Sequence, residues 1–227
     1  MSERALSDVR VIELAEDTAG PYAAKMLADY GADVIKIERP GFGDISRRKG
    51  PFPGDVPHPE KSFQFLYLNT NKKSVTLDVR KPDGTKVFKR MVEDADVLII
   101  DFLPAEMERL GLTYEALSKA NPSLVMVSIT PFGQTGPYRD MKSTDIVQYA
   151  ISSFMNLSGS PDREPLQHAL GQAGFMAARN ALVATMSALL FRDATGQGQF
   201  IDVSIVESIA VQPPFQPTQY TYQGVIA

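Results

Sequence analysis

Basic side chains follow the second apolar run of the sequence and could bind a polyphosphate. Arg39 comes directly after this run, which ends in Lys36-Ile-Glu. Ligands of open α/β sheets bind outside the carboxyl ends of the strands, and guanidinium groups pair well with phosphate oxygens. Further cations come downstream: Arg47, Arg48, Lys72 and Lys73. Composition alone favours the alternative, a charge run that faces solvent.

A glycine and a proline open a helical stretch after the first apolar run. Pro21 presets the first turn of a helix, and Gly20 permits a tight entry into that turn. The N–H groups of the same turn could instead stabilise a thioester carbonyl or a developing oxyanion. Taken by themselves, the two residues favour the structural role.

Composition and spacing exclude several classes of site. The 227-residue chain has no cysteine, which rules out disulfides and cysteine nucleophiles, and with only His58 and His168 we expect no metal site. The turn after the first apolar run lacks G-x-G-x-x-G, so we expect no NAD. The net charge is −4 and the basic residues are scattered, so we expect no nucleic acid.

Short apolar runs rich in β-branched residues predict the scaffold that positions these groups. The continuous runs VLII and LVMV are typical of strands that are buried on both faces of a parallel sheet. We expect strands at residues 9–14, 33–37, 97–100, 124–129 and 200–203, and helices at 22–30, 84–93 and 114–120. The sequence therefore predicts an α/β fold with a Rossmann-like open, mainly parallel sheet and flanking helices.

The pattern divides the chain into one large domain and a short end segment. We expect a Rossmann-like large domain over residues 1–210 and a crossing segment over 211–227, which leads toward a missing small domain. Residues 40–71 should form a long functional loop. The polar start and the short apolar stretch at 181–191 predict a cytoplasmic protein with no membrane segment.

Five stretches of the chain carry a combined signature. The first reads AGPYAAKMLADYGADVIKIERPGFGD, and the last reads RDATGQGQFIDVSIVES. The stretches are residues 19–44, 69–84, 95–117, 121–138 and 192–208. In this order they resemble the N-terminal half of family III CoA-transferases, the CaiB/BaiF family. The combination is specific, whereas each stretch alone would be a weak signal.

The resemblance implies a fold and an activity. Family members have a Rossmann-like large domain and a smaller second domain, with two chains threaded as interlocked rings, so this chain would be an incomplete member. They move CoA between carboxylic acids, with coenzyme A or an acyl-CoA as substrate. A catalytic aspartate attacks the donor acyl-CoA and forms first an aspartyl anhydride and then an aspartyl-CoA thioester.

The resemblance also implies contacts with CoA. Basic side chains would pair with the phosphates, and apolar side chains would pack against the cofactor. The matching positions are Thr18, Ala19, Arg39, Leu77, Asp101, Phe102, Arg109 and Lys142. Two of them depart from the family pattern. Asp101 stands where the family usually has Asn, and its carboxylate would repel phosphates. Thr18 stands where the family often has the longer Gln.

The family's nucleophile is missing from its expected position. Counting back from the turn at Thr195 places that position at Gly174, and residues 165–192 contain no Asp or Glu. Racemases of the same fold use a histidine where this chain has Thr144. The neighbouring Asp145 is expected to cap or flank the start of a helix. We therefore expect no catalytic residue of the family in this chain.

Two functions remain open after this comparison. One is a CoA-transferase that works as part of a complex, in which this chain lacks its own nucleophile. The other is a non-catalytic CoA-binding or scaffolding subunit of a heteromeric CoA-transferase. A self-sufficient transferase and a nucleotide-binding domain of unrelated function are further alternatives. We expect a second chain or homologous subunit as partner, because half of an interlocked ring would expose apolar surface to water.

Overall fold

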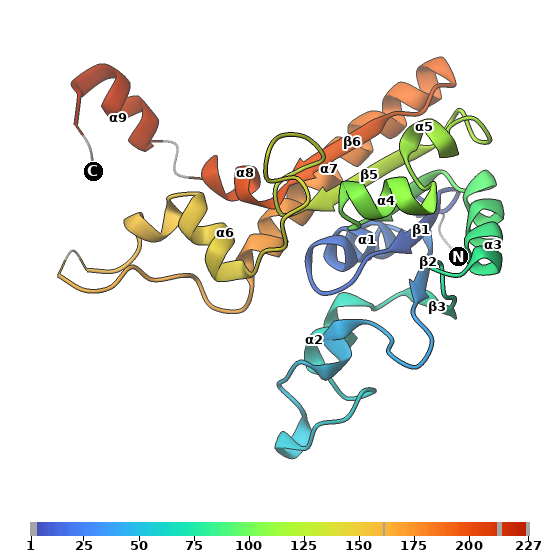
Figure 1. The fold of residues 1–227 in the computed structure, drawn as a ribbon, viewed down its shortest axis with the longest axis horizontal. Coiled ribbons are helices and arrows are strands. Elements are labelled where there is room, and N and C mark those ends of the chain that lie inside the picture. Colours follow the sequence, from blue (N-terminus) through green and yellow to red (C-terminus); the bar gives the residue numbers. More distant parts are fainter. Residues whose placement is uncertain (1–3, 161, 213–214, 226–227) are drawn as a thin grey trace.

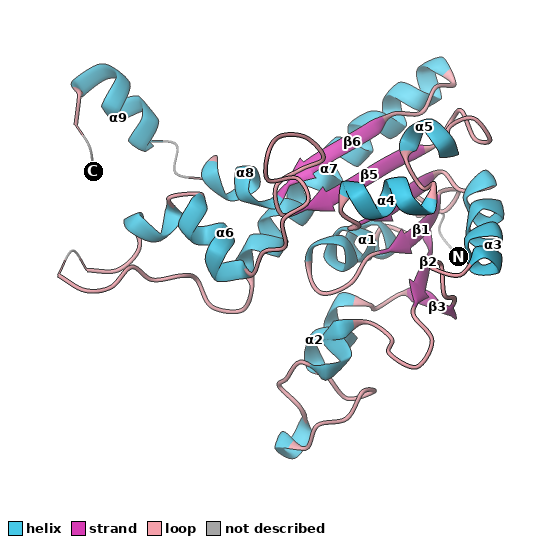
Figure 2. Cartoon of the chain, viewed as in Figure 1, coloured by secondary structure: helices cyan, strands magenta, loops and turns pink. Residues whose placement is uncertain are grey.

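A parallel sheet forms the centre of the molecule in the computed structural model, which describes residues 4–160, 162–212 and 215–225. Six strands lie in the order β3-β2-β1-β4-β5-β6, and all neighbouring pairs are parallel (Figures 1 and 2). The strands are β1 (Arg10–Leu14), β2 (Asp33–Glu38), β3 (Lys72–Thr76), β4 (Val97–Ile100), β5 (Val125–Thr130) and β6 (Phe200–Ser204). This sheet confirms the predicted α/β fold class.

Helices cover both faces of this sheet (Figure 1). On one face, α1 (Ala19–Asp29) and α7 (Gln172–Thr195) share a hydrophobic core with the strands. On the other face, α3 (Pro82–Glu93), α4 (Pro104–Leu110) and α5 (Tyr114–Leu117) share a second core. Further elements are α2 (Phe63–Leu68), α6 (Asp145–Ile151), α8 (Ile205–Ala210), α9 (Phe215–Gln223) and the 3-10 turns η1 (Ile45–Arg48), η2 (Pro53–Asp55) and η3 (Phe154–Leu157).

The central strand β4 explains why its sequence is apolar without alternation. Val97 and Ile99 point into the core that contains α1 and α7. Leu98 and Ile100 point into the core that contains α3. Successive side chains of a strand face opposite sides, so a strand covered on both faces needs apolar residues at every position.

Helices α1 and α7 pack against each other through small side chains. Ala24 of α1 and Ala177 and Ala181 of α7 are fully buried in one core. Because an alanine side chain is a single methyl group, the two helix backbones can approach closely. This contact fixes the start of α7 relative to the start of α1, next to the carboxyl ends of the strands.

Helix α7 is also long and apolar enough to cross a membrane, judged by length and composition alone. Of its most apolar stretch, 39% is buried inside the protein. The alanine face described above lies against α1, and the helix also contacts β5. A core helix of a soluble protein meets the same criteria, so α7 is weak evidence for a membrane segment.

The structure adds elements that the apolar pattern did not predict. Strand β3 has mostly exposed side chains and lies at the edge of the sheet, and α4 follows β4 without a clear apolar period. Residues 40–71 are largely irregular, as expected, but contain η1, η2 and α2. Helix α9 stands apart from the sheet (Figure 1). The role of 211–227 as a crossing segment stays a prediction.

Candidate functional site

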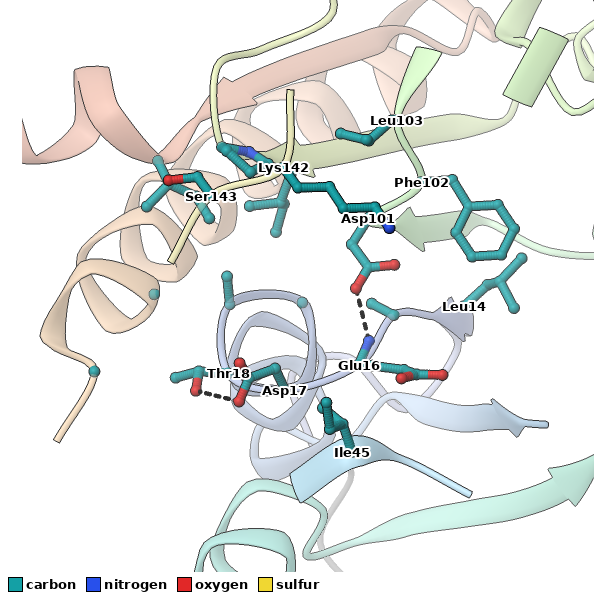
Figure 3. Close-up of a pocket in the computed structure, with 18 of the residues that line it drawn as sticks. Leu14, Glu16, Asp17, Thr18, Ile45, Asp101, Phe102, Leu103, Lys142 and Ser143 are labelled. Carbon is teal, nitrogen blue, oxygen red and sulfur yellow. Dashed lines mark hydrogen bonds between the residues drawn. The ribbon is translucent and has the colours of Figure 1, made fainter. Parts of the chain in front are cut away.

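A pocket of about 840 Å³ opens at the carboxyl ends of the strands. Leu14 ends β1, Asp101 follows β4, and Pro131 follows β5, and all three line it. Figure 3 shows the turn after β1, the segment after β4 and the segment that carries Lys142 around this space. An open parallel sheet binds ligands at this edge, so the pocket lies where the strand order predicts it.

Most of the residues that the sequence singled out meet in this pocket. The lining includes Thr18, Ala19, Arg39, Leu77, Asp101, Phe102, Lys142, Thr144 and Gly174. Arg109 is not among the lining residues, because it lies exposed on α4, and its Nη2 approaches Glu106 Oε1 at 3.5 Å. A contact between Arg109 and CoA therefore stays a prediction, without support from the shape of the pocket.

One part of the pocket, which we call the cationic end, carries three basic side chains: Arg39, Arg80 and Lys142. The Nε atom of Arg39 is buried and has no hydrogen-bond partner among the described residues. Arg80 lies 5.1 Å from the Phe102 ring and bonds to Glu106 at 2.9 Å. Lys142 extends across the space toward Asp101 (Figure 3). Cations beside an aromatic ring suit a ligand with phosphates and a flat ring.

Arg80 was not among the residues predicted from the sequence, although it lies in the same signature stretch as Leu77. Arg80 follows the end of β3, and its neighbours Leu77, Asp78 and Val79 also line the pocket. The end of strand β3 was the signal that could have predicted Arg80. It was missed because β3 is short and lies exposed at the edge of the sheet.

Other cations near β2 belong to a buried ionic network. Lys36 Nζ lies 2.7 Å from both Glu13 and Asp44, and Lys72 Nζ lies 2.7 Å from Glu13. Burial by itself lowers the pKa of Lys36, but its two carboxylates raise the pKa above the ordinary value. Burial lowers the pKa of Lys72 to about 8, although Glu13 opposes this. These ammonium groups hold β1, β2 and β3 together.

Two further cations predicted to bind phosphate also have internal partners. Arg47 binds both oxygens of Glu38, at 2.7 and 2.9 Å, and Lys73 pairs with Asp33 at 2.6 Å. Although burial acts in the opposite direction, the bonds from Arg47 lower the pKa of Glu38 to about 2. The hypothesis of a broad polyphosphate cluster is thus corrected. Among the described cations of the pocket, Arg39 and Lys142 make no ion pair, whereas Arg80 pairs with Glu106 and Lys49 pairs with Asp17.

Asp101 lies at the cationic end and accepts a hydrogen bond from the backbone N–H of Glu16 at 2.8 Å (Figure 3). Burial raises the pKa of Asp101 to about 7. Burial likewise raises the pKa of Glu16. A carboxyl group that is partly protonated near neutral pH repels phosphate less than a carboxylate does. The repulsion expected from the sequence at this position is therefore reduced.

Helix α1 begins at the bottom of the pocket, as the Gly20-Pro21 pattern predicts. A Cβ atom at Gly20 would lie 2.3 Å from the Cβ of Ala15, so glycine is required by packing. Within the described structure Thr18 precedes α1 without a side-chain cap, and Ala19 and Gly20 line the pocket. The first N–H groups of α1 therefore remain as donors for a ligand oxygen. The structural role is confirmed, and the role in binding a thioester or oxyanion stays a prediction.

At the other part of the pocket, which we call the carboxylate end, Gly174 lies in the first turn of α7. A Cβ atom at Gly174 would lie 2.9 Å from Thr18 Cβ and 3.0 Å from Thr18 Cγ2. Thr18 is itself held by Gln64, whose Nε2 donates to Thr18 Oγ1 at 3.2 Å. The space beside Gly174 is thus filled by Thr18. A side chain at position 174 would need this threonine to move.

Asp145 brings a carboxylate to the same place from a different helix. Its Oδ1 accepts a hydrogen bond at 3.3 Å from the N–H of Ala173, the residue before Gly174. Its Oδ2 is buried and has no hydrogen-bond partner among the described residues. Burial raises the pKa of Asp145. Asp145 flanks the start of α6, as the sequence predicted, and its side chain in addition bonds to α7.

The comparisons with known proteins agree with this geometry. The sequence model of CoA-transferase family III matches residues 6–226. The chain is 40% identical over 221 residues to a succinate–glutarate CoA-transferase of Agrobacterium fabrum, covering 96% of this chain and 55% of that protein. It is 38% identical over 205 residues to a subunit of the succinyl-CoA:(R)-benzylsuccinate CoA-transferase of Thauera aromatica, covering 90% and 50%.

A crystal structure of a CaiB/BaiF family protein from Brucella suis superposes with a TM-score of 0.91 at 34% identity. The match covers 100% of this chain and 60% of that one. The chain thus spans about half the length of the curated relatives that it matches.

Proposed function

This chain belongs to CoA-transferase family III, and from that premise we propose that it helps to move CoA between carboxylic acids as part of a complex. The observation that carries the proposal is the pocket at the carboxyl ends of the strands. It brings together seven of the eight residues that the family signature assigns to CoA. Coenzyme A, or its thioester with a carboxylic acid, is the proposed ligand.

The cationic end of the pocket suits the nucleotide part of CoA. Arg39 and Lys142 can neutralise phosphates, because neither makes an ion pair within the described residues and both line the pocket. Phe102 and Leu77 offer apolar surface for the ring or the pantetheine chain. The first turn of α1 can donate N–H groups to the thioester oxygen, which develops negative charge when the carbonyl is attacked.

The family's nucleophile position contributes no carboxylate, since Gly174 has no side chain and Thr18 fills the adjacent space. In the simplest form of the proposal, this chain binds the thioester and a homologous subunit completes the site. The alternative is a non-catalytic CoA-binding or scaffolding subunit of a heteromeric CoA-transferase. The named subunit of the Thauera enzyme supports the heteromeric form, because it aligns over most of this chain.

A partner chain and a cytoplasmic location complete the proposal. Large apolar side chains of α6 and α7 are exposed in the isolated chain, among them Ile146, Val183 and Leu190. An exposed apolar surface of this kind is typical of a contact with another protein segment. Acyl-CoA metabolism and the α/β fold favour the cytoplasm.

The test is a CoA-binding titration of the protein in the assembly in which it is isolated from its cells. Replacing Arg39 with Met should weaken CoA binding about 10- to 100-fold, as expected for losing a charge-assisted bond to phosphate. Arg90, exposed on α3 and outside the pocket, is the matched control, and Arg90→Met should bind as the unmodified protein does. Equal affinities for the two variants, or an assembly that does not bind CoA, would contradict the proposed function.

A further inference from the structure

An acid lies among the cations at the cationic end of the pocket. Asp101 directly follows β4 and lines the cavity. Its Oδ2 accepts the N–H of Glu16 at 2.8 Å, and the side chain of Lys142 extends toward it across the space (Figure 3). A phosphate that binds Lys142 would therefore come close to the carboxyl group of Asp101.

The described lining of this end contains more acids than cations. Arg39, Arg80 and Lys142 are its basic side chains. Four acids line the pocket beside them: Glu16, Asp78, Asp101 and Glu106. If all of these groups were ionised, the acids would exceed the cations by one negative charge. A ligand with several phosphates would then be repelled, and it would bind more tightly if one of the acids carried a proton.

The buried ionic network next to this end does not supply the missing positive charge. Lys36 Nζ lies 2.7 Å from both Glu13 and Asp44, and Lys72 Nζ lies 2.7 Å from Glu13. Two ammonium groups thus face two carboxylates, so the network is neutral by itself. Burial has the largest effect on the pKa of Asp101, and beside it Lys36 lowers and Asp44 raises that pKa.

Asp101 is the acid best suited to hold a proton. Glu106 pairs with Arg80 at 2.9 Å, and Asp78 Oδ1 accepts the backbone N–H of Arg80 at 3.1 Å. These contacts stabilise Glu106 and Asp78 as carboxylates. Asp101 makes no ion pair among the described residues, and burial raises its pKa to about 7.

Glu16 is the second candidate, because burial raises its pKa as well. Asp44 adds to this rise, whereas Arg39 opposes it. The carboxyl group of Glu16 has no hydrogen-bond partner in the part of the chain that the structure describes, so it can rotate away from an incoming phosphate. Asp101 is held in place by the Glu16 N–H and cannot avoid the phosphate in this way.

We propose that Asp101 couples ligand binding at the cationic end to the uptake of a proton. The inference rests on the proposed function, with CoA as the ligand. CoA binds the form of the pocket in which Asp101 is a neutral acid. Because Oδ2 accepts the Glu16 N–H, the proton is on Oδ1, from which it can be donated to a phosphate oxygen. The negative charge of the bound phosphate raises the pKa of Asp101 further, so a proton is taken up with the ligand.

The affinity for CoA should therefore fall as the pH rises through 7. With a pKa of about 7 in the empty pocket, roughly nine-tenths of Asp101 is protonated at pH 6 and roughly one-tenth at pH 8. This difference weakens CoA binding about 10-fold between the two pH values. Ionisation of a phosphate monoester acts in the opposite direction, because its second pKa lies near 6 and a dianion binds cations more tightly.

Calorimetric titration with CoA tests this coupling on the protein in its isolated assembly. Titrations at pH 8 in two buffers of different ionisation enthalpy give the number of protons taken up on binding. At this pH the phosphate is already a dianion, so the uptake reports on the protein. We expect an uptake of between about 0.5 and 1 proton per CoA for the unmodified protein.

A neutral side chain at the same position separates proton uptake from other effects. Asp101→Asn should lose most of the uptake and should bind CoA at pH 8 about 10-fold more tightly than the unmodified protein does. Damage to the fold would not produce a gain in affinity. Asp202 is the matched control, since its Oδ2 also accepts a backbone N–H, that of Gln134 at 2.9 Å, outside this pocket. Asp202→Asn should keep both the uptake and the affinity.

The outcomes distinguish failure of this inference from failure of the proposed function. If CoA binds without a proton uptake that Asp101→Asn removes, or if that variant binds no more tightly at pH 8, the coupling is wrong and the CoA-binding function stands. If only Glu16→Gln removes the uptake, the proton binds at Glu16 and the inference is also wrong. If the assembly binds no CoA at pH 6 or pH 8, the proposed function itself is wrong. Asp101→Ser gives the same comparison if Asp101→Asn does not fold.

Discussion

The cationic end of the pocket rests on a buried ionic network, whereas the carboxylate end rests on close contacts between small residues. Next to the cationic end, a buried ion pair between Lys36 and Glu13 joins the neighbouring strands β2 and β1. At the second, Thr18 and Gly174 leave no room for another methyl group. One end is therefore fixed by charge balance and the other by shape. The two ends should respond to different substitutions.

The largest expected effect tests the charge balance. Lys36→Met would leave Glu13 and Asp44 without their shared buried cation, and we expect the free energy of unfolding to fall by about 3–5 kcal/mol. Denaturant unfolding measures this loss. Lys73→Met is the control, because the Lys73–Asp33 pair is largely exposed, and its change should stay within about 1 kcal/mol. If both variants lost a similar free energy of unfolding, the buried ion pair would not matter more than the exposed one.

A smaller effect tests the close packing of Gly174 against Thr18. Gly174→Ala places a Cβ atom 2.9 Å from Thr18 Cβ, and overpacking of this kind costs about 1–3 kcal/mol, more than the gain from alanine in a helix. We expect a net loss of roughly 1–2 kcal/mol in denaturant unfolding. Thr18→Gly removes the clashing atoms, so the double variant should recover the loss. Additive effects of the two substitutions would contradict this account.

A pH dependence at the cationic end is a third test. The folded-state pKa of Asp101, about 7, lies above its ordinary value of 3.8. The folded protein therefore keeps a proton that the unfolded chain releases, so this contribution to stability is full below about pH 4 and is lost as the pH rises toward 7. Asp101→Asn should flatten that part of the stability curve. Exposed Asp162→Asn should leave it unchanged.

Much of the fold could be predicted from local pattern. The run VLII gave β4 with its observed bounds, because a strand buried on both faces is apolar at each position. Strand β3 was hidden, since an edge strand with exposed Lys73 and Val75 has no such pattern. The pocket also followed from the strand order. Local pattern therefore predicts what is buried between layers and misses what lies at an edge.

The pairing of charges could not be predicted in the same way. Lys72 was predicted among the phosphate-binding cations, but its partner Glu13 lies on another strand. Asp145 and Ala173 are 28 positions apart in the chain, so the sequence showed no carboxylate at the start of α7. Such contacts depend on how strands and helices pack in space. The spacing of residues along the chain does not predict this packing.

The alanine contact between α1 and α7 has a consequence for the width of the pocket. Ala24 of α1 and Ala177 and Ala181 of α7 are fully buried in the core that these two packed helices share. A bulkier residue at one of these sites would act as a wedge and tilt the two helix starts apart. The width of the pocket between these helix starts can thus be changed from inside the hydrophobic core, at positions that do not line it.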